Sequence, residues 1–213
     1  MNTPLSYSVT RCKEGAWQHI DDSVSPEESV YVSWPGSSCR LWAWPDDLEP
    51  LCAGQALHDR DDTPSIVMTP ESIVTHMDAF LTLEGTCPLL WESTGCFHRA
   101  GMFDPKTGAF IRLAEDIGRH NCIDRLAGWA CLNNIDPADT VLFLSARITA
   151  SLYAKARRAG FSFLISRSAV TSTPVEMARE QNRKHPAHPV TILGFCRPRE
   201  QRFTVFAGEG RIA

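Results

Sequence analysis

The fold is decided by residues 141–165, which read VLFLSARITASLYAKARRAGFSFLI. The opening run, 141–144, is continuously apolar, which is typical of a strand covered on both faces. Residues 149–158 predict a helix that ends before Gly160, and residues 161–165 predict the next strand. A strand–helix–strand unit favours parallel neighbours joined by a right-handed crossover. The centre of the chain therefore predicts an α/β sheet.

Patterns on both sides extend this unit. They predict a hairpin of residues 99–103 and 109–114, helices at 70–82, at 119–133 and from Thr173, and strands at 29–33, 40–44, 190–195 and 202–206. Thr69 and Pro70 give the first of these helices an N-cap followed by proline at its first position. We therefore predict an α/β (or α+β) chain, with a small β-rich N-terminal segment at 1–75 and an α/β domain at 76–213.

Composition narrows the class of protein. The chain has 213 residues, and its net charge of −4 with a pI near 6.0 argues against general nucleic-acid binding. No window approaches the roughly 18 apolar residues of a membrane span, so we expect no membrane insertion. Residues 1–7 lack the basic and apolar regions of a signal peptide, and we therefore expect a cytoplasmic protein.

The cysteines do not form an obvious framework. There are eight, at positions 12, 39, 52, 87, 96, 122, 131 and 196. In the cytoplasm they are expected to be free thiols. Because none forms a C-x-x-C pair, a zinc site of the paired C-x-x-C type is not predicted.

Polar residues gather at three places where predicted strands and helices meet. These are residues 115–121 (EDIGRHN), 145–147 (SAR) and 166–171 (SRSAVT). Ligands of open α/β sheets bind beyond the carboxyl ends of the strands. Each place offers backbone N–H groups, polar side chains and an arginine, which together suit an anionic, phosphate-bearing ligand. The alternative is that the polar side chains cap helices and form salt bridges.

Two short motifs, Cys96-Phe97-His98 and His120-Asn121-Cys122, mirror one another. Two cysteines and two histidines suit tetrahedral zinc, although closed sites usually place more residues between ligands. Alternatively, Cys96 beside His98 is a sulfur-carrying thiolate, because a neighbouring imidazolium lowers the pKa of a thiol. The H-x-E and P-C-x-x-C signature of zinc deaminases is missing.

Several motifs in order resemble the FdhD family, the formate dehydrogenase accessory sulfurtransferases. The most specific is EDIGRHNCID at 115–124. The others are TGCFHRA at 94–100, LSAR at 144–147, KA at 155–156, AG at 159–160, SAVT at 168–171, GFCR at 194–197 and RI at 211–212. Their order and spacing agree with the family over roughly residues 77–213.

The resemblance implies a cytidine-deaminase-like, three-layer domain with a mixed sheet and without the deaminase zinc. Its implied ligand is Mo-bis(molybdopterin guanine dinucleotide), with GDP as a mimic and no metal site formed by protein side chains. Family members take sulfur from a cysteine desulfurase and pass it to this cofactor for formate dehydrogenase, often as homodimers. The implied cofactor-binding residues are Arg119, His120, Asn121, Ser145, Arg147, Ser168, Thr171, Phe203, Thr204, Val205, Phe206, Ala207 and Gly208.

The sequence departs from the family at the sulfur carrier. The family's C-x-x-C loop, which precedes the Thr-Gly motif, is missing. Thr94-Gly95-Cys96, Ser145-Ala146-Arg147 and Ser168-Ala169-Val170-Thr171 stand where the family usually has Thr-Gly-Gly, Ser-Gly-Arg and Ser-Ala-Pro-Thr. Two functions stay open: a sulfurtransferase that uses Cys96 with His98, or a cofactor-binding carrier without sulfur transfer.

Overall fold

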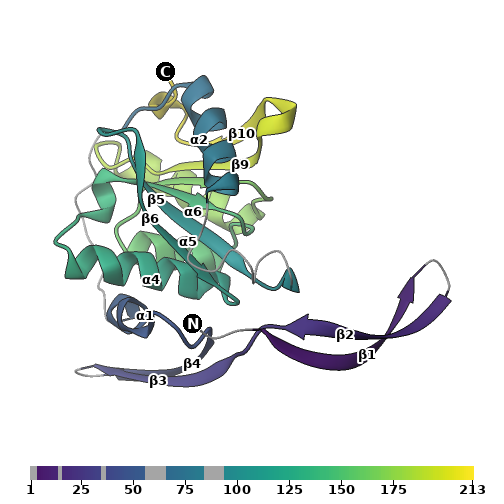
Figure 1. The fold of residues 1–213 in the computed structure, drawn as a ribbon. Coiled ribbons are helices and arrows are strands. Elements are labelled where there is room, and N and C mark those ends of the chain that lie inside the picture. The colour runs from purple at the N-terminus through teal and green to yellow at the C-terminus, as the bar shows by residue number, and fades with distance from the viewer. Residues whose placement is uncertain (1–3, 14–15, 35–36, 56–65, 84–93) are drawn as a thin grey trace.

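The structure is a computed structural model that describes residues 4–13, 16–34, 37–55, 66–83 and 94–213 (Figure 1). Its N-terminal elements are β1 (Leu5–Lys13), β2 (Ala16–Val24), β3 (Glu28–Trp34), β4 (Ser37–Ala43) and α1 (Leu48–Gln55). The elements that follow are α2 (Pro70–Thr82), β5 (His98–Asp104), β6 (Ala109–Asp116), α4 (Arg119–Leu132), β7 (Val141–Leu144), α5 (Ala150–Arg158), β8 (Phe163–Ser166), α6 (Ser172–Lys184), β9 (Thr191–Arg197) and β10 (Arg202–Ala207). Three short 3-10 turns, at 137–139, 198–200 and 209–211, complete this part.

A six-stranded mixed sheet forms the centre of the molecule, in the order β10-β9-β8-β7-β5-β6. Strands β7, β8 and β9 are parallel, whereas β5 runs antiparallel to both β6 and β7. It follows that β6, β7, β8 and β9 all point the same way. Their carboxyl ends lie along one edge of the sheet, which we call the carboxyl edge. The parallel pairs confirm the α/β sheet predicted from the centre of the chain.

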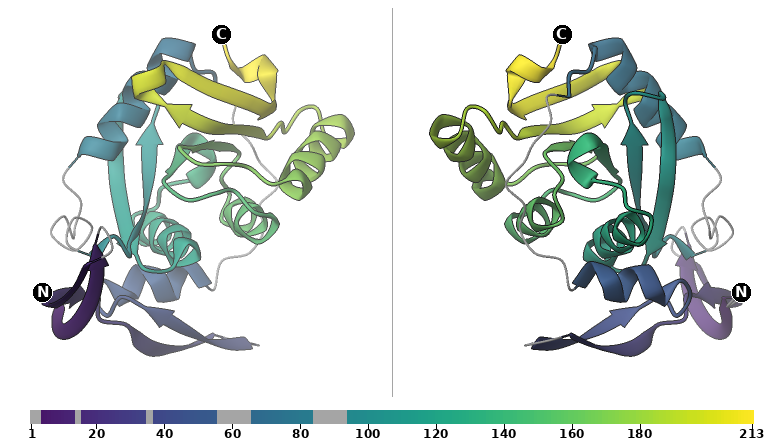
Figure 2. Two further views of the ribbon diagram at one scale, coloured as in Figure 1. Left: turned by 90° about the vertical axis from the view of Figure 1, so that its right-hand side faces the viewer. Right: turned by 90° about the vertical axis from the view of Figure 1, so that its left-hand side faces the viewer.

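Helices cover both faces of the sheet, giving three layers (Figure 2). On one face, α2 buries Met77 and Phe80 against Phe143 and other aromatic side chains of the strands. On the other face lie α4, α5 and α6, and Ile123 and Leu152 belong to the core there. Burying each such side chain stabilises the fold by about 1.5–3 kcal/mol. The mixed three-layer prediction is thus confirmed, while the cytidine-deaminase-like label stays a prediction.

Short-range sequence patterns correctly predict where several elements begin or end. The Oγ1 atom of Thr69 accepts a hydrogen bond from the Ser72 N–H at 3.2 Å, and Pro70 opens α2, as predicted. Gly160, with φ of 98°, ends α5. The next strand begins at Phe163 rather than at 161, because the Phe161 N–H is still bonded to the Ala156 carbonyl at the end of that helix.

Other elements were missed or misplaced. Strands β1 and β2 were not predicted, because β2 is mostly exposed and so lacks apolar alternation. Helix α1 was also missed, and it contains Pro50, a residue that usually interrupts helices. The strand predicted at 40–44 ends at Ala43, because the Trp44 carbonyl accepts from Arg125 instead of a strand.

The N-terminal elements attach to the body chiefly at α4, under which α1 lies (Figure 1). The guanidinium of Arg125 donates to the carbonyls of Trp44, Asp46 and Asp47 and pairs with Asp116. The expected domain boundary at residue 75 falls inside α2, and both halves of that helix bury side chains. Within the described residues, no helix is both long and apolar enough to span a membrane.

The Arg125–Asp116 pair generates a stability prediction. Arg125→Ala leaves Asp116, which is 0% exposed, without its cation, so we expect a loss of about 3–5 kcal/mol in the free energy of unfolding. The control, Arg112→Ala, breaks a partly exposed pair with Asp47 and is expected to cost less than about 1 kcal/mol. Urea unfolding monitored by circular dichroism measures both. Equal losses in the two variants would contradict this role of Arg125.

Candidate functional site

The carboxyl edge brings together loops that are distant in the sequence. Ser145 follows β7, Arg167 follows β8, and Arg197 ends β9. The chain leaves β6 at Asp116 and enters α4 at the same edge, where Asp116 pairs with His98 at the start of β5. All three polar regions singled out from the sequence therefore meet here, as the rule for parallel strands predicts.

Four of the expected residues form what we call the His–Arg cluster: His98, Arg119, His120 and Arg147. His98 opens β5, Arg119 and His120 open α4, and Arg147 follows β7. Burial lowers the pKa of His120 to about 4, and the positive charges of Arg119 and Lys155 add to this effect. Burial likewise lowers the pKa of His98, with contributions from Arg119 and Arg147. At pH 7 both imidazoles are therefore neutral and lie beside permanent cations.

The floor of this cluster lies between α4 and α5. The Nε2 atom of His120 is 3.0 Å from the hydroxyl of Ser151, which is exposed in the first turn of α5. Lys155 pairs with the buried carboxylate of Asp124. Burial raises the pKa of Asp124 to about 6 against the opposing charge of Lys155. Because Lys155 is already paired, Arg119 and Arg147 are the principal cations that this cluster offers to a ligand.

Asn121 has a different environment from its neighbours. Its side-chain nitrogen donates to the Asp116 carboxylate at 2.9 Å and to the Trp42 carbonyl at 3.0 Å. Asp116 also accepts from the Gly118 N–H at 2.8 Å, and a Cβ at Gly118 would lie 2.8 Å from the Asn121 nitrogen. Burial raises the pKa of Asp116 even against the charge of Arg125. Asn121 thus fixes the turn into α4, and both donor positions of its amide are used inside the protein.

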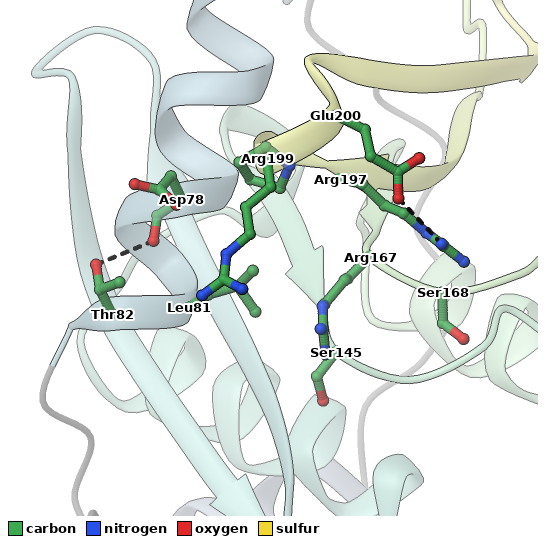
Figure 3. Close-up of a pocket in the computed structure, with 10 residues that line it drawn as sticks. Asp78, Leu81, Thr82, Ser145, Arg167, Ser168, Arg197, Arg199 and Glu200 are labelled. Atoms are coloured by element: carbon green, nitrogen blue, oxygen red, sulfur yellow. Dashed lines mark hydrogen bonds and ion pairs between the residues drawn. The ribbon is translucent and has the colours of Figure 1, made fainter.

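A separate pocket opens at the same edge on the α2 side of the sheet (Figure 3). It has a volume of about 680 Å³, and we call it the arginine pocket. Its lining residues are Asp78, Leu81, Thr82, Ser145, Arg167, Ser168, Arg197, Pro198, Arg199 and Glu200. The structure therefore brings the expected Ser145 and Ser168 together in one pocket. No residue of the His–Arg cluster lines it.

The arginine pocket contains arginines in addition to the expected Ser145 and Ser168. Arg167 is the arginine of the 166–171 region that the sequence predicts to suit an anionic ligand, although it is not among the residues implied to bind the cofactor. Arg197 lies in the GFCR motif, and Arg199 lies in none of the motifs. Arg199 belongs to the 3-10 turn at 198–200 between β9 and β10. Arg167 follows Ser166 at the end of β8, where the sequence predicts a ligand-binding loop. Arg199 lines the pocket because the turn between β9 and β10 folds back toward α2 (Figure 3).

The last expected residues lie mostly in packed positions. On β10, Phe203 and Val205 pack into the core on the α2 side, while Phe206 and Ala207 belong to the core on the other side. Thr204 is exposed on the same strand. Since β10 is antiparallel to β9, Ala207 pairs with Ile192 at the opposite edge of the sheet from the arginine pocket.

Two expected residues near the ends of elements remain. Gly208 follows β10, and its carbonyl accepts from the Thr191 hydroxyl at 3.2 Å, also at the opposite edge. Thr171 is exposed at the N-cap of α6, with its hydroxyl 3.5 Å from the Ile148 carbonyl. Neither residue lines the arginine pocket.

The cysteines differ sharply in accessibility. Cys96 is exposed, and its thiol lies 3.4 Å from the Thr94 carbonyl. Cys122 and Cys196 are buried, and burial raises the pKa of both thiols, that of Cys196 to about 12. Cys131 is exposed at the far end of α4. Of the cysteine side chains that the structure describes, Cys96 is the exposed thiol next to the His–Arg cluster in the chain.

The zinc alternative finds no support in this arrangement. It needs the sulfur of Cys122, which is fully buried and donates to the His98 carbonyl at 3.4 Å. Among the residues for which coordinates are described, no three or more His, Cys, Asp or Glu side chains group so as to hold a metal ion.

The environment of His120 generates a pH prediction. We expect its imidazole to titrate in the folded protein with a midpoint near 4, against about 6.5 for an exposed histidine. Between these values the unfolded chain binds a proton that the folded chain excludes, so His120 lowers the stability as the pH falls from 6.5 to 4. NMR titration of the ring measures the midpoint directly. Arg119→Gln removes a neighbouring positive charge and is expected to raise it; a midpoint above 6 in the unaltered protein contradicts the prediction.

Comparisons with known proteins identify the family of the chain. Residues 52–213 match the FdhD/NarQ family. The chain is 40% identical over 107 residues to Protein FdhD of Methanocaldococcus jannaschii, which covers 50% of this chain and 44% of that protein. It is 32% identical over 218 residues to the sulfur carrier protein FdhD of Streptomyces coelicolor, which covers 98% of this chain and 67% of that protein.

A solved structure shows the same fold. The crystal structure of a protein from Desulfotalea psychrophila, described as a formate dehydrogenase accessory protein, superposes with a TM-score of 0.81 at 18% identity and covers 100% of both chains. Matches to several relatives span about half of their length or less, for example 37% of the sulfur carrier protein FdhD of Chromobacterium violaceum. The match over residues 52–213 covers most of the chain and confirms the resemblance of the motifs. The chain therefore belongs to the FdhD/NarQ family.

Proposed function

We propose that this chain binds the guanine-dinucleotide form of the molybdenum cofactor as cargo and serves as an accessory protein for a formate dehydrogenase. The observation that carries the proposal is the His–Arg cluster at the carboxyl edge, where Arg119 and Arg147 lie beside two neutral histidines. Relatives are named sulfur carrier proteins, and the structural neighbour is described as a formate dehydrogenase accessory protein.

The donor set of the cluster fits a phosphate-bearing ligand. A guanidinium donates paired hydrogen bonds to phosphate oxygens and stays charged at every physiological pH. A neutral imidazole donates one N–H without the charge repulsion that a second cation would add. The N-terminal turn of α4, which has no side-chain cap, adds a favourable field for an anion. Arg119 and Arg147 would hold phosphate groups, and His98 and His120 would complete the contacts.

Cys96 is the proposed sulfur carrier. In this step the Cys96 thiolate attacks the terminal sulfur of a persulfide on a cysteine desulfurase. A new S–S bond forms at Cys96 while the donor S–S bond breaks, and the donor cysteine leaves as a thiolate that takes up the proton lost by Cys96. His98, two residues on and neutral at pH 7, is available to relay that proton. The C-x-x-C loop of the family is not needed for this route.

The partner proteins are also proposed. A formate dehydrogenase would receive the cofactor, in line with the description of the structural neighbour as a formate dehydrogenase accessory protein. A cysteine desulfurase would supply the sulfur, as the resemblance of the sequence motifs implies. Assembly as a homodimer and a cytoplasmic location stay predictions from the sequence.

The binding half of the proposal predicts an affinity change. GDP, used as the nucleotide probe, is expected to bind the unaltered protein, and Arg119→Gln or Arg147→Gln is expected to weaken it about ten-fold, because each removes a charged hydrogen bond worth about 1.5 kcal/mol or more. Isothermal titration calorimetry measures this. Arg183→Gln, in an exposed pair on α6, is the control and should leave the affinity unchanged. No heat of binding at millimolar GDP would refute the proposed ligand.

The sulfur half predicts a labelling result. After incubation with a cysteine desulfurase and labelled cysteine, persulfide is expected on the unaltered protein and is expected to be lost in Cys96→Ser. Cys131→Ser removes an exposed thiol at the other end of α4 and should keep the label. Mass spectrometry of the alkylated peptides locates the sulfur. If Cys96→Ser keeps full labelling, Cys96 is not the carrier; if the unaltered protein takes no label, the chain is a cofactor carrier without sulfur transfer.

A further inference from the structure

We infer that Trp44, together with Ser25, is a positioning residue for sulfur transfer, because these two side chains hold the segment that carries Cys96 in one place. The inference rests on the proposed function of Cys96 as the sulfur carrier, whereas the contacts that support it do not depend on that role. We call residues 94–98 the Cys96 loop. The loop leads directly into β5, which begins at His98.

The Cys96 loop places an exposed thiol beside a buried ring. Cys96 is exposed, whereas Phe97 is only 3% exposed. Gly95 has a φ of 62°, in the left-handed region that favours glycine. The Cys96 N–H donates to the Thr94 hydroxyl at 3.2 Å, and the thiol lies 3.4 Å from the Thr94 carbonyl. These bonds shape the loop, and contacts of Phe97 and Thr94 attach it to other segments.

The first attachment is the packing of Phe97 on Trp44. The centroids of the two rings are 5.5 Å apart, and the rings meet edge to face at 70°. Trp44 is 2% exposed, and the two rings form a small core with Ile117, apart from the two larger cores of the sheet. Edge-to-face contact stabilises such a pair beyond the burial of its area. The residue next to Cys96 is therefore held by a ring from the N-terminal segment.

Trp44 is itself held firmly by its backbone. Its carbonyl accepts a hydrogen bond from the Arg125 guanidinium at 2.7 Å, and Arg125 pairs with the buried Asp116. Two residues earlier, the Trp42 carbonyl accepts from the Asn121 side chain at 3.0 Å. Because both bonds lead to buried side chains of the sheet and α4, the indole ring reaches the Cys96 loop from a fixed base.

The second attachment comes from the connection between β2 and β3. Ser25 directly follows β2 and is partly buried. Its hydroxyl donates to the Thr94 hydroxyl at 2.9 Å, although the two residues are 69 positions apart in the chain. Thr94 precedes Cys96 and Phe97 follows it. The N-terminal segment therefore holds the loop on both sides of the thiol, through Ser25 on one side and Trp44 on the other.

Transfer of sulfur between two proteins requires a thiol that is held in place. The Cys96 thiolate must come within about 3–3.5 Å of the terminal sulfur of the donor, in line with the bond that breaks. Two docked proteins change their backbones little, so a mobile loop would seldom present the thiol correctly. A small alkylating reagent approaches an exposed thiol from any side. Loss of positioning is therefore expected to slow sulfur transfer without slowing alkylation.

The indole N–H of Trp44 separates packing from hydrogen bonding. Its Nε1 atom is buried, and within the part of the chain that the structure describes it has no hydrogen-bond partner. A buried donor without an acceptor destabilises the fold, so this N–H contributes nothing to holding the loop. The ring does so by its contact with Phe97. Trp44→Phe, which keeps an aromatic ring and removes the N–H, is therefore expected to keep the loop in place.

The test measures three quantities on the full chain: hydrogen exchange of the Cys96 loop, persulfide labelling by a cysteine desulfurase, and alkylation of Cys96 by iodoacetamide, each located by mass spectrometry. Trp44→Ala is expected to raise loop exchange and slow labelling about ten-fold, and Ser25→Ala about three-fold, because ring packing or one hydrogen bond is lost. Neither variant should slow alkylation, and Trp44→Phe should stay within about two-fold of the unaltered protein in all three. Trp42→Ala and Ser29→Ala, at exposed positions of the same segment, are the matched controls. Melting temperatures check folding, and Ser25→Ala keeps the test decisive if Trp44→Ala does not fold.

The outcomes separate this inference from the proposed function. Faster loop exchange and slower labelling with undiminished alkylation support the positioning role. If the folded variants keep normal loop exchange or normal labelling, that role is overturned, even where Cys96→Ser shows that Cys96 carries the sulfur. Alkylation that slows in step with labelling, or a Trp44→Phe variant as impaired as Trp44→Ala, also overturns it. If the unaltered protein takes up no label, the proposed sulfur transfer falls and the positioning role falls with it, while loop exchange still shows whether the two contacts hold the loop.

Discussion

The buried ion pair between Arg125 and Asp116 is the interaction on which the site depends. Its side chains are 2% and 0% exposed, so each charge needs the other. The same two residues also bind Gly118, Asn121 and backbone carbonyls of the N-terminal segment. This ion pair therefore holds together the end of β6, the first turn of α4 and the N-terminal elements.

Because the Arg125–Asp116 ion pair holds the first turn of α4, it also fixes the position of the charged residues of that turn at the carboxyl edge. His120 extends from this turn to the Ser151 hydroxyl at the start of α5, 3.0 Å away, and Arg119 precedes it in the same turn. His120 is partly buried beside cations, which keeps its imidazole neutral well below pH 6. The permanent charge of the cluster is thus carried by arginine alone. Such a surface attracts anions over the whole physiological pH range rather than switching with pH.

The ends of the parallel strands form a long carboxyl edge, along which the arginine pocket and the His–Arg cluster lie as separate features. The loop after β7 is short, and it contributes Ser145 to one side and Arg147 to the other. Helix α2 and the β9–β10 turn close the first side, and α4 with α5 closes the second (Figures 1 and 3). A chain without the family's C-x-x-C loop still retains this arrangement. In the proposed function, anion binding and sulfur carriage are therefore separable.

The elements with local causes are already specified in the amino-acid sequence. The apolar run at 141–144, the N-cap at Thr69 and the glycine at 160 each specify a strand, a helix start or a helix end through contacts within a few residues. The motifs of the sequence, which span roughly residues 77–213, also identify the family, and the family match covers residues 52–213. Exposed strands such as β2 carry no apolar alternation, and for that reason they left no such signal.

Which polar residues come together depends on the packing of segments that are distant in the chain. Asn121 belongs to the most specific motif, yet its amide is used inside the protein, because Asp116 and the Trp42 carbonyl approach it from distant segments. Arg199 belongs to none of the motifs, yet it lines the pocket, because the β9–β10 turn folds back toward α2. Such contacts join residues far apart in the chain. No local spacing encodes them, and packing of the sheet and its helices alone sets them.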